Sequence, residues 1–176
     1  MRSHRLRVAA VLLVAASLTA CGTTTRLPPL VEPAPSGPCL EELPEISNFS
    51  FDRLRGVSIE QRVVAEVVHF TFEPADPGFI SLTVQPAKPP WWSNATGEPV
   101  AIDGEQHTSV RFEGLRGVGA GERLAARPGD GARIRDVVRI EDRNTVHWVL
   151  GTVAGTCLRL VVDEAAALVS IHVSGP

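Results

Sequence analysis

Short runs in which every second residue is apolar constrain this fold more than any other feature of the chain. A β-strand turns successive side chains to opposite faces, so each such run predicts a strand that buries one face. Glycine and proline separate the runs, and no stretch keeps a helical period for longer than two turns. About eight strands are therefore expected, over residues 46–54, 63–72, 79–84, 108–112, 134–140, 145–153, 157–162 and 167–173.

The short connections between these one-sided strands predict an antiparallel sandwich or barrel, because each apolar face must be covered. We expect an all-β fold, a small antiparallel β-sandwich formed by residues 39–176. Trp148 should lie in its core, whereas Glu66 interrupts an apolar face and residues 114–131 should form a long glycine-rich surface loop. In the run 134–140 the alternation directs Ile134, Val138 and Ile140 inward and Arg133, Arg135 and Arg139 outward.

The N-terminal residues have the organisation of a secretory signal. Three arginines precede an uncharged run over residues 8–20, which is too short for a comfortable transmembrane helix of about 20 residues. The sequence Leu18-Thr19-Ala20-Cys21 resembles the lipobox of bacterial lipoproteins. That resemblance implies cleavage before Cys21, acylation of Cys21, and attachment to the extracytoplasmic face of the cell membrane. A buried Cys21 after an ordinary signal is the alternative.

Charge and composition limit the partners of the mature chain. Residues 1–20 contain three arginines and no acidic residue, so their removal lowers the formal net charge from −3 to −6. An acidic chain is a poor ligand for nucleic acid or anionic lipid surfaces. Residues 21–38 carry five prolines, which favour an extended tether over regular structure.

The two remaining cysteines are Cys39 and Cys157. Export removes a protein from the reducing cytosol, so a leftover cysteine pair is a disulfide candidate. Such a bond would fasten the N-terminal part of the domain to a late strand. Two unrelated buried thiols are the alternative.

The usual catalytic and cofactor patterns do not occur in the sequence. The glycines of residues 117–121 lack the Gly-Lys-Ser/Thr of a phosphate-binding loop, and there is no Gly-x-Ser-x-Gly nucleophile elbow. His69, His147 and His172 fall opposite the apolar faces of their strands, so we expect them at exposed or sheet-surface positions. Their spacing does not indicate a metal site. We therefore expect neither a metal nor another cofactor, and no enzymatic activity.

Trp91 and Trp92 are the candidate ligand contacts. They follow Pro89-Pro90 and precede Ser93-Asn94, which predicts a loop or strand edge. Neighbouring strand residues point to opposite faces, so one indole can pack inward while the other stacks on a sugar or a partner. Packing of both indoles on loops and the sheet rim is the alternative.

Three segments, in sequence order, carry a family resemblance. They are Val68–Pro74 followed by Pro77–Phe79, Gly97–Val100 followed by Asp103-Gly104, and Arg159–Asp163. Together they resemble the AMIN-like lipoproteins of high-GC Gram-positive bacteria. The resemblance implies a small β-sandwich and, through the more distant AMIN domains that help place envelope proteins on peptidoglycan, a binding role. It carries no functional residue over to this chain, in which His69 replaces the usual aliphatic residue.

The functional expectation is a non-catalytic binding module of the cell envelope, with peptidoglycan or an envelope protein as its partner. The alternative is a carrier that holds a lipid or another hydrophobic small molecule between its sheets. A carrier requires an apolar cavity of several hundred Å³, the usual scale of a ligand pocket. An enzyme would instead require a cleft with convergent histidine, serine or carboxylate groups.

Overall fold

The computed structural model describes residue 39 and residues 43–47, 50–75, 81–92, 96–115, 117–118, 132–141 and 145–175. All of these belong to one compact unit, Val31–Pro176. The expected signal peptide, the acylated Cys21, the tether and most of the glycine-rich loop lie outside the described residues. The part that is described contains no helix capable of crossing a membrane.

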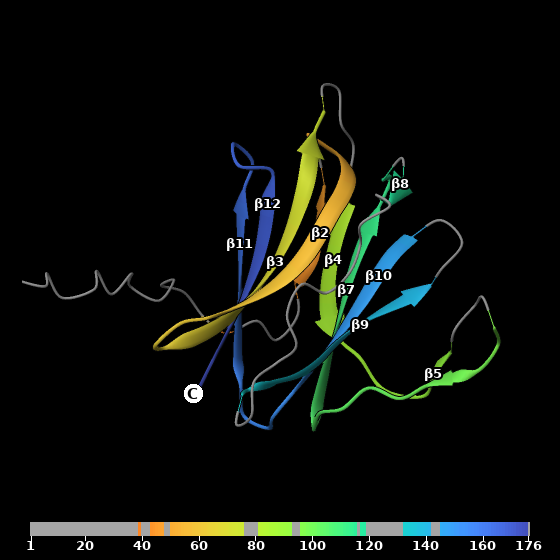
Figure 1. Cartoon of the computed structure of the whole chain (residues 1–176), viewed down its shortest axis with the longest axis vertical. Helices are drawn as coiled ribbons and strands as arrows, with labels where there is room; N and C mark the ends of the chain where they lie inside the picture. The colour runs from red at the N-terminus through yellow and green to blue at the C-terminus, as the bar shows by residue number, and fades with distance from the viewer. Residues whose placement is uncertain are drawn as a thin grey trace, which may run out of the picture. The chain divides into compact units, whose positions relative to one another are not determined.

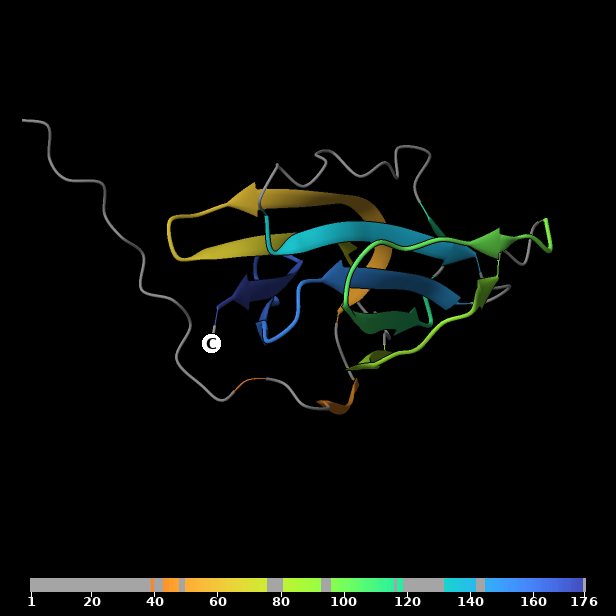
Figure 2. The ribbon, with the colours of Figure 1, turned by 90° about the horizontal axis from the view of Figure 1, so that it is seen from below.

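Ten strands form two five-stranded sheets that face each other (Figures 1 and 2). The first sheet has the order β1-β4-β7-β10-β9, and the second has the order β11-β12-β3-β2-β8. All pairings are antiparallel except the short β2–β8 pair. The strands are β1 (Leu43–Ser47), β2 (Phe51–Gln61), β3 (Ala65–Pro74), β4 (Ser81–Pro86), β7 (Gln106–Glu113), β8 (Gly117–Val118), β9 (Ile134–Glu141), β10 (Thr145–Thr152), β11 (Cys157–Asp163) and β12 (Leu168–Ser174).

The all-β antiparallel fold is confirmed, with ten strands in the two sheets instead of about eight. The run predicted over residues 46–54 is divided between β1 and β2, and β8 lies within the expected glycine-rich loop. A further two-stranded ribbon pairs β5 (Trp91–Trp92) with β6 (Pro99–Val100). In Figure 2 this green ribbon projects at the right.

Aromatic side chains from both sheets fill the space between them. Phe70 lies at the centre, with its ring centroid 5.1 Å from Phe112 and 6.1 Å from Trp148. Phe72 contacts Phe112 at 5.1 Å and stacks on Phe51 at 5.0 Å. Trp148 is buried as predicted, and such edge-to-face and stacked pairs add to the free energy gained by burial.

A buried carboxylate also joins the two sheets. Glu66 occupies the apolar face of β3, where its oxygens accept hydrogen bonds from the backbone N–H groups of Arg133, at 2.9 Å, and Ile134, at 2.8 Å. These two donors begin β9 of the opposite sheet. The acidic residue that interrupts the alternation therefore accepts from two backbone donors at the start of a strand, of which the N–H of Ile134 is buried and that of Arg133 is part-buried.

The predicted faces of β9 hold for Ile134 and for the exposed Arg135, but they were wrong from Val137 onward. Gly151 pairs with Asp136 and Thr152 with Ile134, so β9 has one extra residue at this point. A bulge of this kind reverses the alternation. Val137 consequently lies in the core, whereas Val138 and Ile140 pair with outward residues of β10.

A glycine allows the chain that follows β6 to lie against the outer face of the first sheet. A Cβ atom at Gly151 would overlap the carbonyl oxygen of Asp103. The backbone N–H of Glu105 also donates to the carbonyl of Thr152, at 2.8 Å. This close approach holds residues 101–105, the segment between the ribbon and β7, against the sheet.

Candidate functional site

The β5–β6 ribbon presents the two predicted tryptophans differently. Trp91 pairs with Val100 and is half-buried, with its ring centroid 5.9 Å from that of His107. Trp92 is 53% exposed. The two tryptophans thus differ in exposure: Trp91 is packed and Trp92 is open to solvent, as neighbouring residues on opposite faces of a strand can be.

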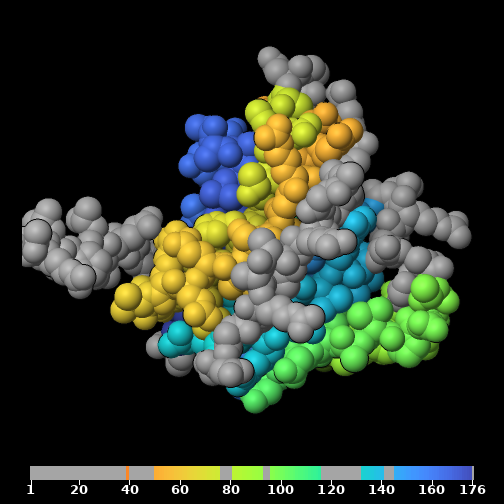
Figure 3. Space-filling view, in the orientation of Figure 1, coloured from red at the N-terminus to blue at the C-terminus, as the bar shows by residue number. Residues whose placement is uncertain are grey.

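Two neighbouring hollows flank this ribbon and share Pro89 and His107. The smaller hollow, of about 310 Å³, is mainly apolar and has Trp91 in its wall. The larger hollow, of about 500 Å³, opens where β4 ends and where β7 and β11 begin. The ribbon and the segment that follows it form the green surface at the lower right of Figure 3. The larger hollow is lined by Pro86, Ala87, Lys88, Pro89, Glu105, Gln106, His107, Thr108, Thr156 and Leu158.

Hydrogen bonds fix the polar wall of the larger hollow. Nε2 of His107 donates to the carbonyl of Ile102 at 3.2 Å, so Nδ1 of the neutral ring is an acceptor. Glu105 accepts the N–H of Ala154 at 3.1 Å, and Gln106 accepts the hydroxyl of Thr156 at 3.3 Å. With the exposed Lys88, the hollow offers a cation, a carboxylate, an amide and hydroxyl groups. These hydrogen-bond donors and acceptors suit a polar ligand better than a hydrocarbon chain.

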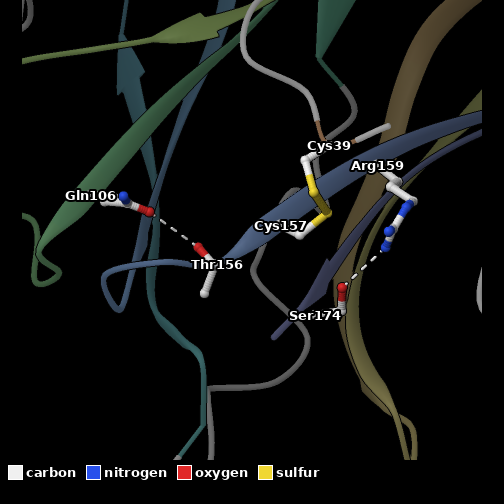
Figure 4. The surroundings of a disulfide bond; sticks show 6 residues. All are labelled: Cys39, Gln106, Thr156, Cys157, Arg159 and Ser174. Carbon is white, nitrogen blue, oxygen red and sulfur yellow. Dashed lines mark hydrogen bonds between the residues drawn. A yellow bond between two sulfur atoms is a disulfide. The ribbon is translucent and has the colours of Figure 1, made fainter. Parts of the chain in front are cut away.

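The expected disulfide between Cys39 and Cys157 is present, with a Cα–Cα distance of 5.0 Å and a sequence separation of 118 (Figure 4). Cys157 lies between Thr156 and Leu158, which both line the larger hollow. The bond therefore holds Cys39 next to this end of the sandwich.

A serine, a histidine and a glutamate meet on the outer face of the second sheet, which sequence reasoning did not anticipate. Nδ1 of His69 lies 2.9 Å from Oγ of Ser170, and Nε2 donates to the carboxylate of Glu60 at 2.9 Å. Hydrogen bonds from Arg62, first, and from His69 lower the pKa of Glu60 below its ordinary value of 4.5. Cross-strand register β2–β3–β12 brings the three together.

In this cluster the serine is buried and the acid is exposed, which is the reverse of the arrangement in a catalytic triad. A nucleophilic serine must reach the substrate while the acid behind the histidine is shielded. Here Ser170 is only 4% exposed and the side chain of Glu60 is 49% exposed. The cluster therefore acts as a cross-strand hydrogen-bonded link.

Two of the other histidines correct an expectation. His147 and His172 do lie opposite the core-facing residues of their strands, yet they are buried, at 7% and 9% exposure. His147 makes a 2.8 Å hydrogen bond with Ser109 of β7. Among the described residues, no group of three or more histidine, cysteine or acidic side chains could hold a metal ion.

The fold and the site define a two-layer antiparallel β-sandwich with paired hollows and an exposed indole at one end. Comparisons with protein-family models, curated protein sequences and solved structures found no significant match. Of the predicted site residues, Trp91 and Trp92 lie on the ribbon that flanks the hollows. Sequence reasoning missed Lys88, Glu105 and His107, because only the fold brings residues 86–89 and 105–108 together with β11.

Proposed function

We propose that this protein is a lipoprotein attached through Cys21 to the extracytoplasmic face of the cell membrane. In this proposal it is a non-catalytic, AMIN-like binding module, and its ligand is the glycan of peptidoglycan. The observation that carries the binding role is Trp92, which is 53% exposed on the same short ribbon whose other tryptophan, Trp91, lines the smaller hollow. The exposed face of an aromatic ring can stack on a sugar ring or pack against a partner.

The chemistry of the larger hollow favours a polar ligand over the carrier alternative. The interior between the described strands is occupied by the contacts among Phe51, Phe70, Phe72, Phe112 and Trp148. The larger hollow instead lies at the end of the sandwich and carries charged and amide groups. Hydroxyl and amide groups of a sugar could be matched there by hydrogen bonds, as in small-molecule sites generally.

Co-sedimentation with purified, protein-free sacculi tests this proposal. The wild-type protein is expected to sediment with the sacculi, and Trp92→Ala to bind about 2- to 12-fold more weakly, the range given by an aromatic stacking energy of about 0.5–1.5 kcal/mol. Val63→Ala is the matched control, because Val63 is 88% exposed in the turn between β2 and β3.

Each failure has a distinct meaning. A wild-type protein that stays in the supernatant refutes the peptidoglycan ligand. Binding to sacculi only before their attached proteins are removed would favour an envelope protein as the partner. Equal binding by wild type and Trp92→Ala would place the site elsewhere on the protein.

A further inference from the structure

Strand β11 is an exposed sheet edge that is both long and regular. It pairs with β12 over seven consecutive residues without a register shift, and no described strand lies on its other side (Figure 1). The other three edges in the described part of the sheets differ: β9 contains a bulge, the pairing of β1 is irregular, and β8 has two residues. A regular edge without proline, lysine or a bulge presents backbone groups that can pair with another strand.

After the buried Cys157 and Leu158, the side chains of β11 are only partly covered. Leu160 and Val162 pack against the core but remain partly exposed, and Val161 on the opposite face is 38% exposed. A further strand beside β11 would cover apolar surface on both faces of the second sheet. Such burial favours pairing in addition to the backbone hydrogen bonds.

The sequence of β11 is complementary to itself in the antiparallel direction. From Arg159 to Asp163 it contains a cation, three apolar residues and an anion. When two copies pair about Val161, Arg159 lies opposite Asp163 of the second copy, and Leu160 lies opposite Val162. The charged pairs share the outer face, and the apolar pairs share the core side. Registers centred on Leu160 or on Val162 leave these charges without an opposite partner.

We propose that two copies of this protein associate through β11, which joins their second sheets into one continuous antiparallel sheet with its two-fold axis at Val161. A two-fold interface forms each favourable pair twice. Arg159 donates to Oγ of Ser174 at 3.1 Å through one of the five N–H groups of its guanidinium. Asp163 accepts the N–H of Ala166 through Oδ1 at 3.0 Å. One strand pair is a small interface, so the dimer should form reversibly. This proposal is independent of the ligand.

Cysteine cross-linking of the full chain tests the symmetry axis. Val161→Cys places two thiols opposite each other in the dimer, within the distance that a disulfide spans. Mild oxidation of detergent-solubilised protein should give a dimer linked through residue 161, identified by mass spectrometry. Val63→Cys is the control because Val63 is more exposed, at 88%. The proposal is overturned if Val161→Cys cross-links no more than this control.

Charge exchange tests the register. Arg159→Asp or Asp163→Arg alone would create two like-charge pairs per dimer, and we expect sedimentation to show a dissociation constant raised about tenfold or more. The double variant Arg159→Asp/Asp163→Arg restores both opposite-charge pairs and should restore dimerisation. A double variant as weak as the single variants, with unchanged circular dichroism, would overturn the register.

Discussion

Removal of the Cys39–Cys157 disulfide should cost a large part of the stability of the domain. The bond closes a chain segment with a sequence separation of 118. In the chain-entropy treatment, a loop of that length restricts the unfolded state by about 16 cal/mol/K, or about 4.9 kcal/mol at 25 °C. The appropriate variant is Cys39→Ser/Cys157→Ala, because Cys157 is buried and a serine hydroxyl there would add a desolvation cost.

Urea unfolding followed by intrinsic tryptophan fluorescence measures this cost. With a denaturant dependence of about 2 kcal/mol/M, the midpoint should fall by about 2.5 M urea. Wild-type protein with its disulfide reduced is the control, and it should unfold at nearly the same urea concentration as the variant. A loss below about 1 kcal/mol in both would refute the reasoning, because the bond would then constrain little of the unfolded chain.

Three further substitutions test separate parts of the structure. Glu66→Ala leaves one buried and one part-buried backbone donor without their acceptor and should cost about 2–5 kcal/mol in denaturant unfolding; a cost below about 1 kcal/mol would contradict this role. Glu60 has a lowered pKa when folded, so its contribution is present above its ordinary pKa of 4.5 and disappears as the pH falls through the folded value. The unfolding free energies of wild type and Glu60→Gln should therefore differ by about 1 kcal/mol or less at neutral pH and converge in acid, and a gap that widens in acid would contradict it. Gly151→Ala should displace the segment at Asp103 and weaken sacculus binding while the amide spectrum of the second sheet is kept; unchanged spectra around residue 103 would contradict the close approach.

The alternation of apolar residues predicted most of the strands because a half-buried strand leaves a period of two in the sequence. Trp148 was placed correctly in the core for this reason. The same rule failed in β9, where the extra residue opposite Gly151 and Thr152 shifts Val137 inward. A bulge is a property of two paired strands, so one strand's alternation gives no sign of it.

The candidate site could be predicted only in part. A loop or strand edge with exposed aromatic residues was predicted from Pro89-Pro90-Trp91-Trp92, since prolines are typical of strand edges. The hollows depend on contacts between segments far apart in the chain, including the hydrogen bond of Ala154 with Glu105 and the approach of Asp103 to Gly151. The burial of His147 and His172 likewise depends on what the fold packs around them.

The most direct test of the binding function is chemical-shift mapping with a soluble glycan fragment of peptidoglycan. Titration into isotopically labelled protein should shift the amide signals of the non-proline residues in 86–92 and 99–108 and the indole signal of Trp92, with little change at the outer face of the second sheet. Shifts confined to the region of Ser170, or no saturable shift at all, would contradict the assignment of the ligand to the hollows beside the β5–β6 ribbon.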